Sequence, residues 1–162
     1  MNREYLVLFL GKAGGNKAKE LLIKLYRNDE ESAVIRAYAV NSLAYQNVRK
    51  AIPEIKKEIE RIETYPFKKR RKNHKIYMYS IAALVKFGDK SSYSRLINAA
   101  RSNNTAVRRR AIHLLKDLQD KRSIDILKYK MTYDHDKKIR KVAKEALKKM
   151  GVPVDDDKKD KK

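Results

Sequence analysis

The sequence predicts an all-α fold, a solenoid of stacked antiparallel helix hairpins. Three observations support this prediction. One apolar pattern recurs through the chain at intervals of 31 to 41 residues. No stretch shows the sustained alternation of apolar and polar residues that a half-buried strand would need. Glycine and proline are scarce, with 5 and 3 of the 162 residues, and this composition suits helices joined by short turns.

The first helix of each hairpin is predicted from an apolar stripe at offsets 0, 4, 7 and 8, which share one helical face. A small residue at offset 4 would let a neighbouring helix approach closely. Four copies are clear, and a fainter one lies near Leu6 and Gly11. The four copies are Ile35, Ala39, Ser42 and Leu43; Ile76, Ser80, Ala83 and Leu84; Val107, Ala111, Leu114 and Leu115; and Ile139, Ala143, Ala146 and Leu147.

A second apolar segment follows the fainter copy and each of the first three clear copies. These segments are residues 18–26, 51–59, 92–100 and 123–131. Turns such as Gly14-Gly15-Asn16 and Gly88-Asp89-Lys90 end one helix and begin the next. A hairpin of this length cannot bury both of its faces alone, whereas a stack of hairpins can. We therefore expect one domain over residues 1–150 and a charged disordered tail over 151–162.

Positive charge is concentrated in the second half of the chain. The protein has 41 Lys and Arg against 20 Asp and Glu, a net charge of +21. Residues 1–64 carry +3, residues 65–150 carry +18, and the tail is neutral. Such an excess bears on partners and solubility rather than on the fold. A well-solvated lysine-rich surface is the simplest alternative to a binding role.

The densest charge lies in an insertion of about ten residues, at about 63–73, between the copy that begins at Ile35 and the copy that begins at Ile76. Pro66 bars helix continuation and disfavours helix at Tyr65, so a protruding loop is expected, ending at Asn73 as the N-cap of the next helix. The alternative is a solvated connector. Five consecutive cations are the candidate contacts for an acidic or phosphate-bearing partner: Lys68, Lys69, Arg70, Arg71 and Lys72.

Two helical faces form the other basic candidates. The last predicted helix carries a lysine stripe at spacings of 4, 3 and 4, and an earlier helix carries a smaller patch of the same kind. The alternative for the stripe is a polar cap on the end of the stack. The stripe is Lys137, Lys141, Lys144 and Lys148, and the patch is Arg109, His113 and Lys116.

The repeating pattern resembles the short bacterial and archaeal form of the HEAT repeat. Val107-Arg108 opens the best-matching copy, and Pro53 lies where the family often has proline early in its second helix. The resemblance covers about residues 2–150 and implies a right-handed solenoid of four to five repeats. It also implies a structural role for the repeat arginines, which would pair with turn residues near them: Arg36 with Asp29, Arg108 with Asn103 or Asn104, and Arg140 with Asp134 or Asp136.

The sequence predicts no enzyme, and no catalytic, cofactor-binding or metal-ligating residue is assigned. Cysteine is absent, and the three histidines are separate, with no His-Glu or His-x-x-x-His arrangement. Asp134-His135-Asp136 occupies an inter-helix turn, where aspartate is expected for capping. The HEAT-like enzymes use His-Glu pairs or tryptophans beside an aspartate, and this chain has neither.

Residues 5–10 form the longest apolar run. It is shorter than the ~20 residues that span a bilayer and shorter than a signal-peptide core, so a soluble, cytoplasmic protein is expected. The predicted first helix is nonetheless apolar on every side and expects cover. An upstream segment of a longer chain, a partner or a second copy could supply it.

These observations favour a non-enzymatic interaction scaffold whose basic second half binds an acidic protein partner. The alternative is sequence-nonspecific nucleic-acid binding through phosphate contacts from the same half. An anionic membrane surface is a less favoured third partner, because it requires only the charge.

Overall fold

The computed structural model describes residues 3–154, and over these residues it contains helices and turns but no strand. The predicted all-α fold is confirmed. Contacts divide the chain into two compact units, Met1–Ser94 and Arg95–Lys162. The helices are α1 (Arg3–Ala13), α2 (Asn16–Arg27), α3 (Ala33–Tyr45), α4 (Ile52–Glu63), α5 (Phe67–Lys72), α6 (His74–Lys86), α7 (Lys90–Ala100), α8 (Thr105–Leu118), α9 (Ile124–Tyr133) and α10 (Lys137–Lys149), with 3₁₀ turns at Arg49–Ala51 and Lys121–Ser123.

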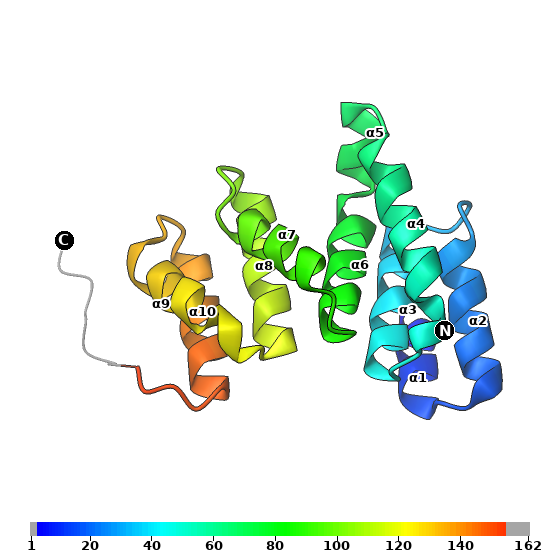
Figure 1. The fold of residues 1–162 in the computed structure, drawn as a ribbon, viewed down its shortest axis with the longest axis horizontal. Helices are drawn as coiled ribbons and strands as arrows, with labels where there is room; N and C mark the ends of the chain where they lie inside the picture. The colour runs from blue at the N-terminus through cyan, green and yellow to red at the C-terminus, as the bar shows by residue number, and fades with distance from the viewer. Residues whose placement is uncertain (1–2, 155–162) are drawn as a thin grey trace. The chain divides into compact units, whose positions relative to one another are not determined.

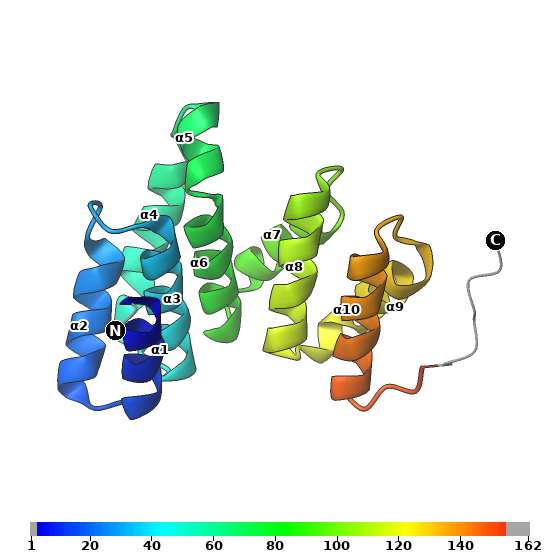
Figure 2. The same ribbon diagram turned by 180° about the vertical axis from the view of Figure 1, so that it is seen from behind.

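The first unit has two layers of helices. α1, α3 and α6 lie side by side in one layer, as Figure 2 shows, and α2 and α4 pack behind them. Ala39 and Ser80, the small residues at offset 4 of the repeat, are fully buried where α3 meets α6. The Tyr26 hydroxyl and Ser80 Oγ form a buried hydrogen bond of 3.0 Å. Small side chains therefore set the close approach of the first-layer helices, as the repeat pattern predicts.

The second unit repeats this arrangement. α8 packs on α10, and α9 packs on α10 from the other layer (Figure 1). Ala111 and Ala143 again occupy offset 4 and are fully buried. α7 lies across the division between the units, with Ser94 on one side of it and Arg95 on the other. The predicted first and second helices of every repeat are thus present as helices.

A capping residue precedes three of the first-layer helices. It occupies the same position in each repeat, three residues before the first residue of the apolar stripe. Ser32 Oγ accepts a hydrogen bond from the Ile35 amide, and the Asn104 and Asp136 side chains each accept two amide hydrogen bonds at the starts of α8 and α10. These side chains satisfy amides that the helix itself leaves unpaired.

The expected loop at 63–73 is wrong in one respect, because residues 67–72 form the short helix α5. Pro66 ends the preceding helix but then acts as the N-cap of α5, with φ −56° and ψ 152°. A proline is tolerated at a helix start because its missing N–H would have no helical partner there. Lysine and arginine also favour helix.

Asn73 is the N-cap of α6, as expected, but makes no side-chain cap bond. Its side-chain amide instead donates to the Lys69 carbonyl, at 2.9 Å. The single domain expected over 1–150 stays a prediction, and contacts divide the chain into the two units described above. At the predicted tail, α10 ends before Gly151, which has φ 72°. Residues 155–162 lie outside the described residues.

Candidate interaction surface

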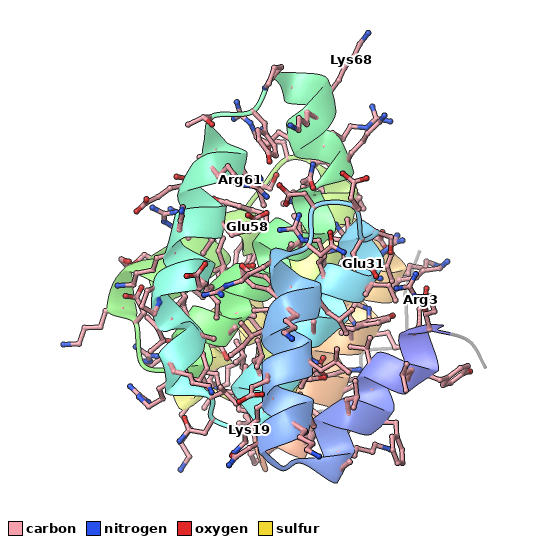
Figure 3. The ribbon with its side chains drawn as sticks, turned by 90° about the vertical axis from the view of Figure 1, so that its right-hand side faces the viewer. Arg3, Lys19, Glu31, Glu58, Arg61 and Lys68 are labelled. Atoms are coloured by element: carbon pink, nitrogen blue, oxygen red, sulfur yellow. The ribbon has the colours of Figure 1, made fainter. Side chains whose placement is uncertain are left out.

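α5 presents a dense cluster of exposed charge, here called the α5 cluster: Lys68, Lys69, Arg70, Arg71 and Lys72. All five side chains are exposed, and the aromatic ring of Phe67 beside them is 75% exposed. Figure 3 shows Lys68 pointing away from the body of the first unit. The cluster is therefore open to a partner from several directions.

Tyr65 ties the base of α5 to α4. The Lys69 ammonium lies 3.9 Å from the centre of the Tyr65 ring, and the Arg61 guanidinium carbon lies 5.8 Å from it. Arg70 donates a hydrogen bond to the Tyr65 carbonyl at 3.2 Å. Since cations over an aromatic face are attracted by its quadrupole, these contacts hold α5 in place.

No ion pair joins the five cations of the α5 cluster to a carboxylate among residues 3–154, although the charge of Lys69 helps to lower the pKa of Asp29. Arg70 also lines a cavity of about 350 Å³ with Glu63, His74 and Tyr77. In that cavity the Tyr77 hydroxyl donates to Glu63 at 2.8 Å. Most of the positive charge of α5 is thus not paired within the described chain.

The patch predicted on α8 has a different environment. Arg109 forms an ion pair with Asp136, and Lys116 forms one with Glu145 at 3.3 Å. Both carboxylates come from the neighbouring first-layer helix and its cap. Partial burial, followed by repulsion from Lys116, lowers the pKa of His113. A large part of the charge expected on this patch is compensated within the second unit.

The lysine stripe of α10 lies on one helical face, as predicted. Lys137, Lys141 and Lys148 are exposed, whereas Lys144 is half-buried. Lys144 and Lys148 also have partners within the molecule. The stripe offers fewer free cations than its sequence suggests, and they are spread over more than two helical turns.

Arg36 lies in a buried ionic network between α2, α3 and α4. Its guanidinium donates to the Tyr26 carbonyl at 2.8 Å and pairs with Glu58 at 2.8 Å and Asp29 at 3.0 Å. Arg61 pairs with the same two carboxylates, and its hydrogen bond lowers the pKa of Asp29. The network borders a cavity of about 280 Å³.

Arg108 and Arg140 occupy equivalent positions in the next repeats. Arg108 donates to the carbonyls of Ser102 and Asn103 in the turn before its helix and pairs with Asp134 of the following repeat at 3.0 Å. Arg140 donates to the Asp134 carbonyl at 2.9 Å. These arginines link helices to turns and face the interior of their unit rather than an external partner.

Sequence reasoning missed a mixed surface of tyrosines and lysines on α3 and α6. The Lys75 ammonium lies 4.7 Å from the Tyr38 ring, and the Lys86 ammonium lies 3.6 Å from the Tyr45 ring. Burial lowers the pKa of Lys86. The signal was the helical spacing of Tyr38 and Tyr45, which are seven residues apart and so share a face.

The sequence analysis also missed a second aromatic pair. Tyr129 and Tyr133 on α9 are both exposed, with ring centres 5.2 Å apart. Their spacing of four residues places them on one helical face.

Clusters that could bind a metal and helices that could span a membrane are both missing from the part of the chain that the structure describes. No group of three or more His, Asp or Glu side chains there could hold a metal ion. No helix among residues 3–154 has the length and apolar character needed to cross a membrane. Asp134 and Asp136 instead pair with Arg108 and Arg109.

Comparison with protein families gives a match to a model for HEAT repeats over residues 69–148. The matched segment begins in α5, contains α6 to α9 and ends near the end of α10. A comparison with curated proteins gives no significant match. HEAT repeats generally serve as protein-interaction scaffolds. The matched segment, just under half of the chain, carries the repeated hairpins, buried small residues and turn-bound arginines that the structure displays, and residues 69–148 are thus similar to HEAT repeats.

Proposed function

We propose that this protein is a non-enzymatic interaction scaffold that binds an acidic segment of a partner protein through the α5 cluster. The observation that carries the proposal is the contrast between two basic surfaces. The five cations of α5 are exposed and form no ion pair with a carboxylate within residues 3–154, whereas Arg109 and Lys116 of α8 are paired.

The electrostatics of α5 favour an acidic ligand. Lys68 and Arg71, like Lys69 and Lys72, are three residues apart on the helix and repel each other. Lys68 in the first turn also opposes the helix dipole, whereas the other four cations lie in the last turn, where the dipole favours positive charge. Carboxylates of a partner would relieve both effects, and they would form charge-assisted hydrogen bonds with Arg71.

The repeat fold gives the α5 cluster a fixed position. Contacts to Tyr65 hold α5 against the end of α4, and α5 leads directly into α6, whose helix is packed against α3 and α4. A charged helix held on a packed scaffold loses less conformational entropy on binding than a flexible loop with the same charge. The lysine stripe of α10 is a secondary contact surface in this proposal, and Arg36, Arg108 and Arg140 are structural.

The test compares two variants with equal changes in charge. The first replaces Lys68, Lys69, Arg71 and Lys72 by glutamine and keeps Arg70, because Arg70 donates to the Tyr65 carbonyl. The control variant replaces Lys137, Lys141, Lys144 and Lys148 by glutamine. Each variant lowers the net charge by four. Far-UV circular dichroism and the melting temperature establish that both remain folded.

Binding to a poly-glutamate peptide is measured by fluorescence anisotropy at about 0.1 M salt. Exposed charge pairs contribute about 0.2–1 kcal/mol each, so loss of four pairs should weaken binding by at least about fourfold. The α10 variant should change the affinity by less than about threefold. Equal losses in the two variants would show that net charge, and not α5, determines binding.

Oligonucleotides serve as the competing probe. Duplex and single-stranded DNA are titrated at two salt concentrations, since a contact with five phosphates gives a slope of log K against log salt near −4 to −5. Tighter binding to either oligonucleotide than to poly-glutamate at the same salt, lost in the α5 variant, would replace the protein partner by nucleic acid. We expect poly-glutamate to bind more tightly.

A further inference from the structure

The outward side of α1 exposes several large apolar side chains. Tyr5 is 69% exposed, Leu6 37%, Leu8 38% and Phe9 65%. Val7 alone among the α1 residues is buried. Figure 3 faces this end of the unit, where α1 begins at Arg3 beside Glu31. Contiguous apolar surface of this kind usually marks an interaction site.

The exposed residues are arranged symmetrically about Val7. Tyr5 and Phe9 lie two positions before and after it, and Leu6 and Leu8 lie one position before and after it. The exposed fractions follow the same symmetry, because the two aromatic rings match each other and the two leucines match each other. A two-fold axis at the level of Val7 would therefore place Tyr5 beside Phe9 of a second, antiparallel α1. Leu6 and Leu8 point about 200° apart, so each would lie at one edge of the face, beside its own counterpart.

Charge also favours a second copy at this face. Residues 1–64 carry a net charge of only +3, whereas residues 65–150 carry +18. Two copies that meet elsewhere would bring large like charges together. At α1, Arg3 is already paired with Glu31, so little uncompensated charge lies at the start of the helix.

We propose that the outer face of α1 binds a second copy of this chain, in an antiparallel pair of α1 helices. Tyr5 of one copy contacts Phe9 of the other, while Leu6 and Leu8, on opposite edges of the face, each contact their own counterpart. Such an interface is isologous, since the same patch serves both copies. It uses a surface separate from the α5 cluster and does not depend on the proposed function.

The size of the patch predicts a weak dimer. An aromatic side chain contributes about 150–250 Å² of buried surface, so the four side chains together offer roughly 300–400 Å² per copy. A standard interface buries about 800 Å² per partner. The dimer is therefore expected to form and dissociate within the micromolar range of protein concentration.

Sedimentation velocity from about 10 to about 500 µM protein tests the proposal. The weight-average mass should rise with concentration, and it should rise further with added salt, because salt screens the repulsion between two +21 chains. The double variant Tyr5→Ser, Phe9→Ser should raise the dissociation constant at least tenfold. The control Leu21→Ser removes another exposed apolar side chain, on α2, and should leave the constant unchanged.

Cysteine cross-linking tests the antiparallel geometry, since the natural chain contains no cysteine. Oxidation of a mixture of Tyr5→Cys and Phe9→Cys proteins should give the mixed cross-link in preference to either self-cross-link. A cross-link formed mainly by Tyr5→Cys with itself would overturn the antiparallel pairing. A monomeric mass at every protein concentration would overturn the proposed dimer. This outcome would overturn it regardless of whether an upstream segment or another protein covers α1. Poly-glutamate binding, measured separately, would be unaffected by either result.

Discussion

Replacing Asp134 by asparagine should destabilise the protein strongly, because this carboxylate neutralises two buried cations. The Asp134 side chain is only 2% exposed and pairs with Arg108 at 3.0 Å and Lys130 at 3.1 Å. It also accepts the Asp136 amide hydrogen bond at 3.0 Å. Asparagine keeps the shape of the side chain but removes its charge, which leaves Arg108 and Lys130 without their counter-ion.

The expected cost is about 3–5 kcal/mol of unfolding free energy, the range found when one member of a buried ion pair is removed. Urea titration followed by circular dichroism at neutral pH measures it, with the slope of the transition checked for constancy. The control is Glu145→Gln, which removes the same charge from a pair with Lys116 in which Glu145 is 47% exposed. That pair should contribute no more than about 1 kcal/mol. Equal costs for the two substitutions would refute the reasoning.

The same residue predicts a pH dependence. Burial raises the pKa of Asp134, but hydrogen bonds from Arg108, the Asp136 amide and Lys130 outweigh burial and hold this pKa below its ordinary value. The ionised carboxylate therefore contributes its stability above about pH 4, the ordinary value for aspartate, and loses it as the pH falls through the lower folded pKa. The difference in stability between wild type and Asp134→Asn should be constant from pH 7 to about 5 and shrink below about pH 4.

Three further predictions test the packing, a buried hydrogen bond and a helix cap. Gly11→Ala should lower the free energy of unfolding by about 1–3 kcal/mol, because the new Cβ would lie 2.4 Å from Ser42 Oγ. Thermal melts should show that stability partly recovers when Ser42→Gly is added. If Gly11→Ala costs no stability, the close approach of α1 to α3 is contradicted. Tyr26→Phe and Ser80→Ala should each lower the free energy of unfolding by about 1–2 kcal/mol, since each leaves one buried hydroxyl without its hydrogen-bond partner. The double variant should cost less than the sum of the two single variants. Strict additivity would exclude the hydrogen bond. Asn104→Ala should cost about 1 kcal/mol through loss of the α8 cap, measured in urea, and a neutral result would contradict the cap.

Most of the fold follows from local pattern. Offsets of 4, 7 and 8 from Ile35 or Ile139 identify the first-layer helices, because helical periodicity alone decides which residues share a face. The small residue at offset 4 indicates close packing before any partner helix is known. Turn residues such as Asp136 mark helix starts, because their side chains accept amide hydrogen bonds that no helical carbonyl can reach.

The candidate surface was only partly predictable, because the pairing of charges depends on neighbours in the next repeat. Arg109 and Lys116 read as free cations in the sequence, yet their carboxylates, Asp136 and Glu145, lie 27 and 29 residues downstream. That separation is slightly less than the repeat spacing, so an acidic residue one repeat later is the signal that could reveal such pairs. At Pro66, a helix-breaking rule predicted a loop where proline instead begins a helix.

The most direct test of the central claim is an NMR titration of the protein with poly-glutamate, which locates the bound surface residue by residue. We predict that the largest amide shift changes fall on residues 66–74, around the uncompensated cations of α5. Changes on residues 105–118 should be small, because Arg109 and Lys116 are already paired there. Largest changes on α8 or α10, with α5 unaffected, would contradict the account.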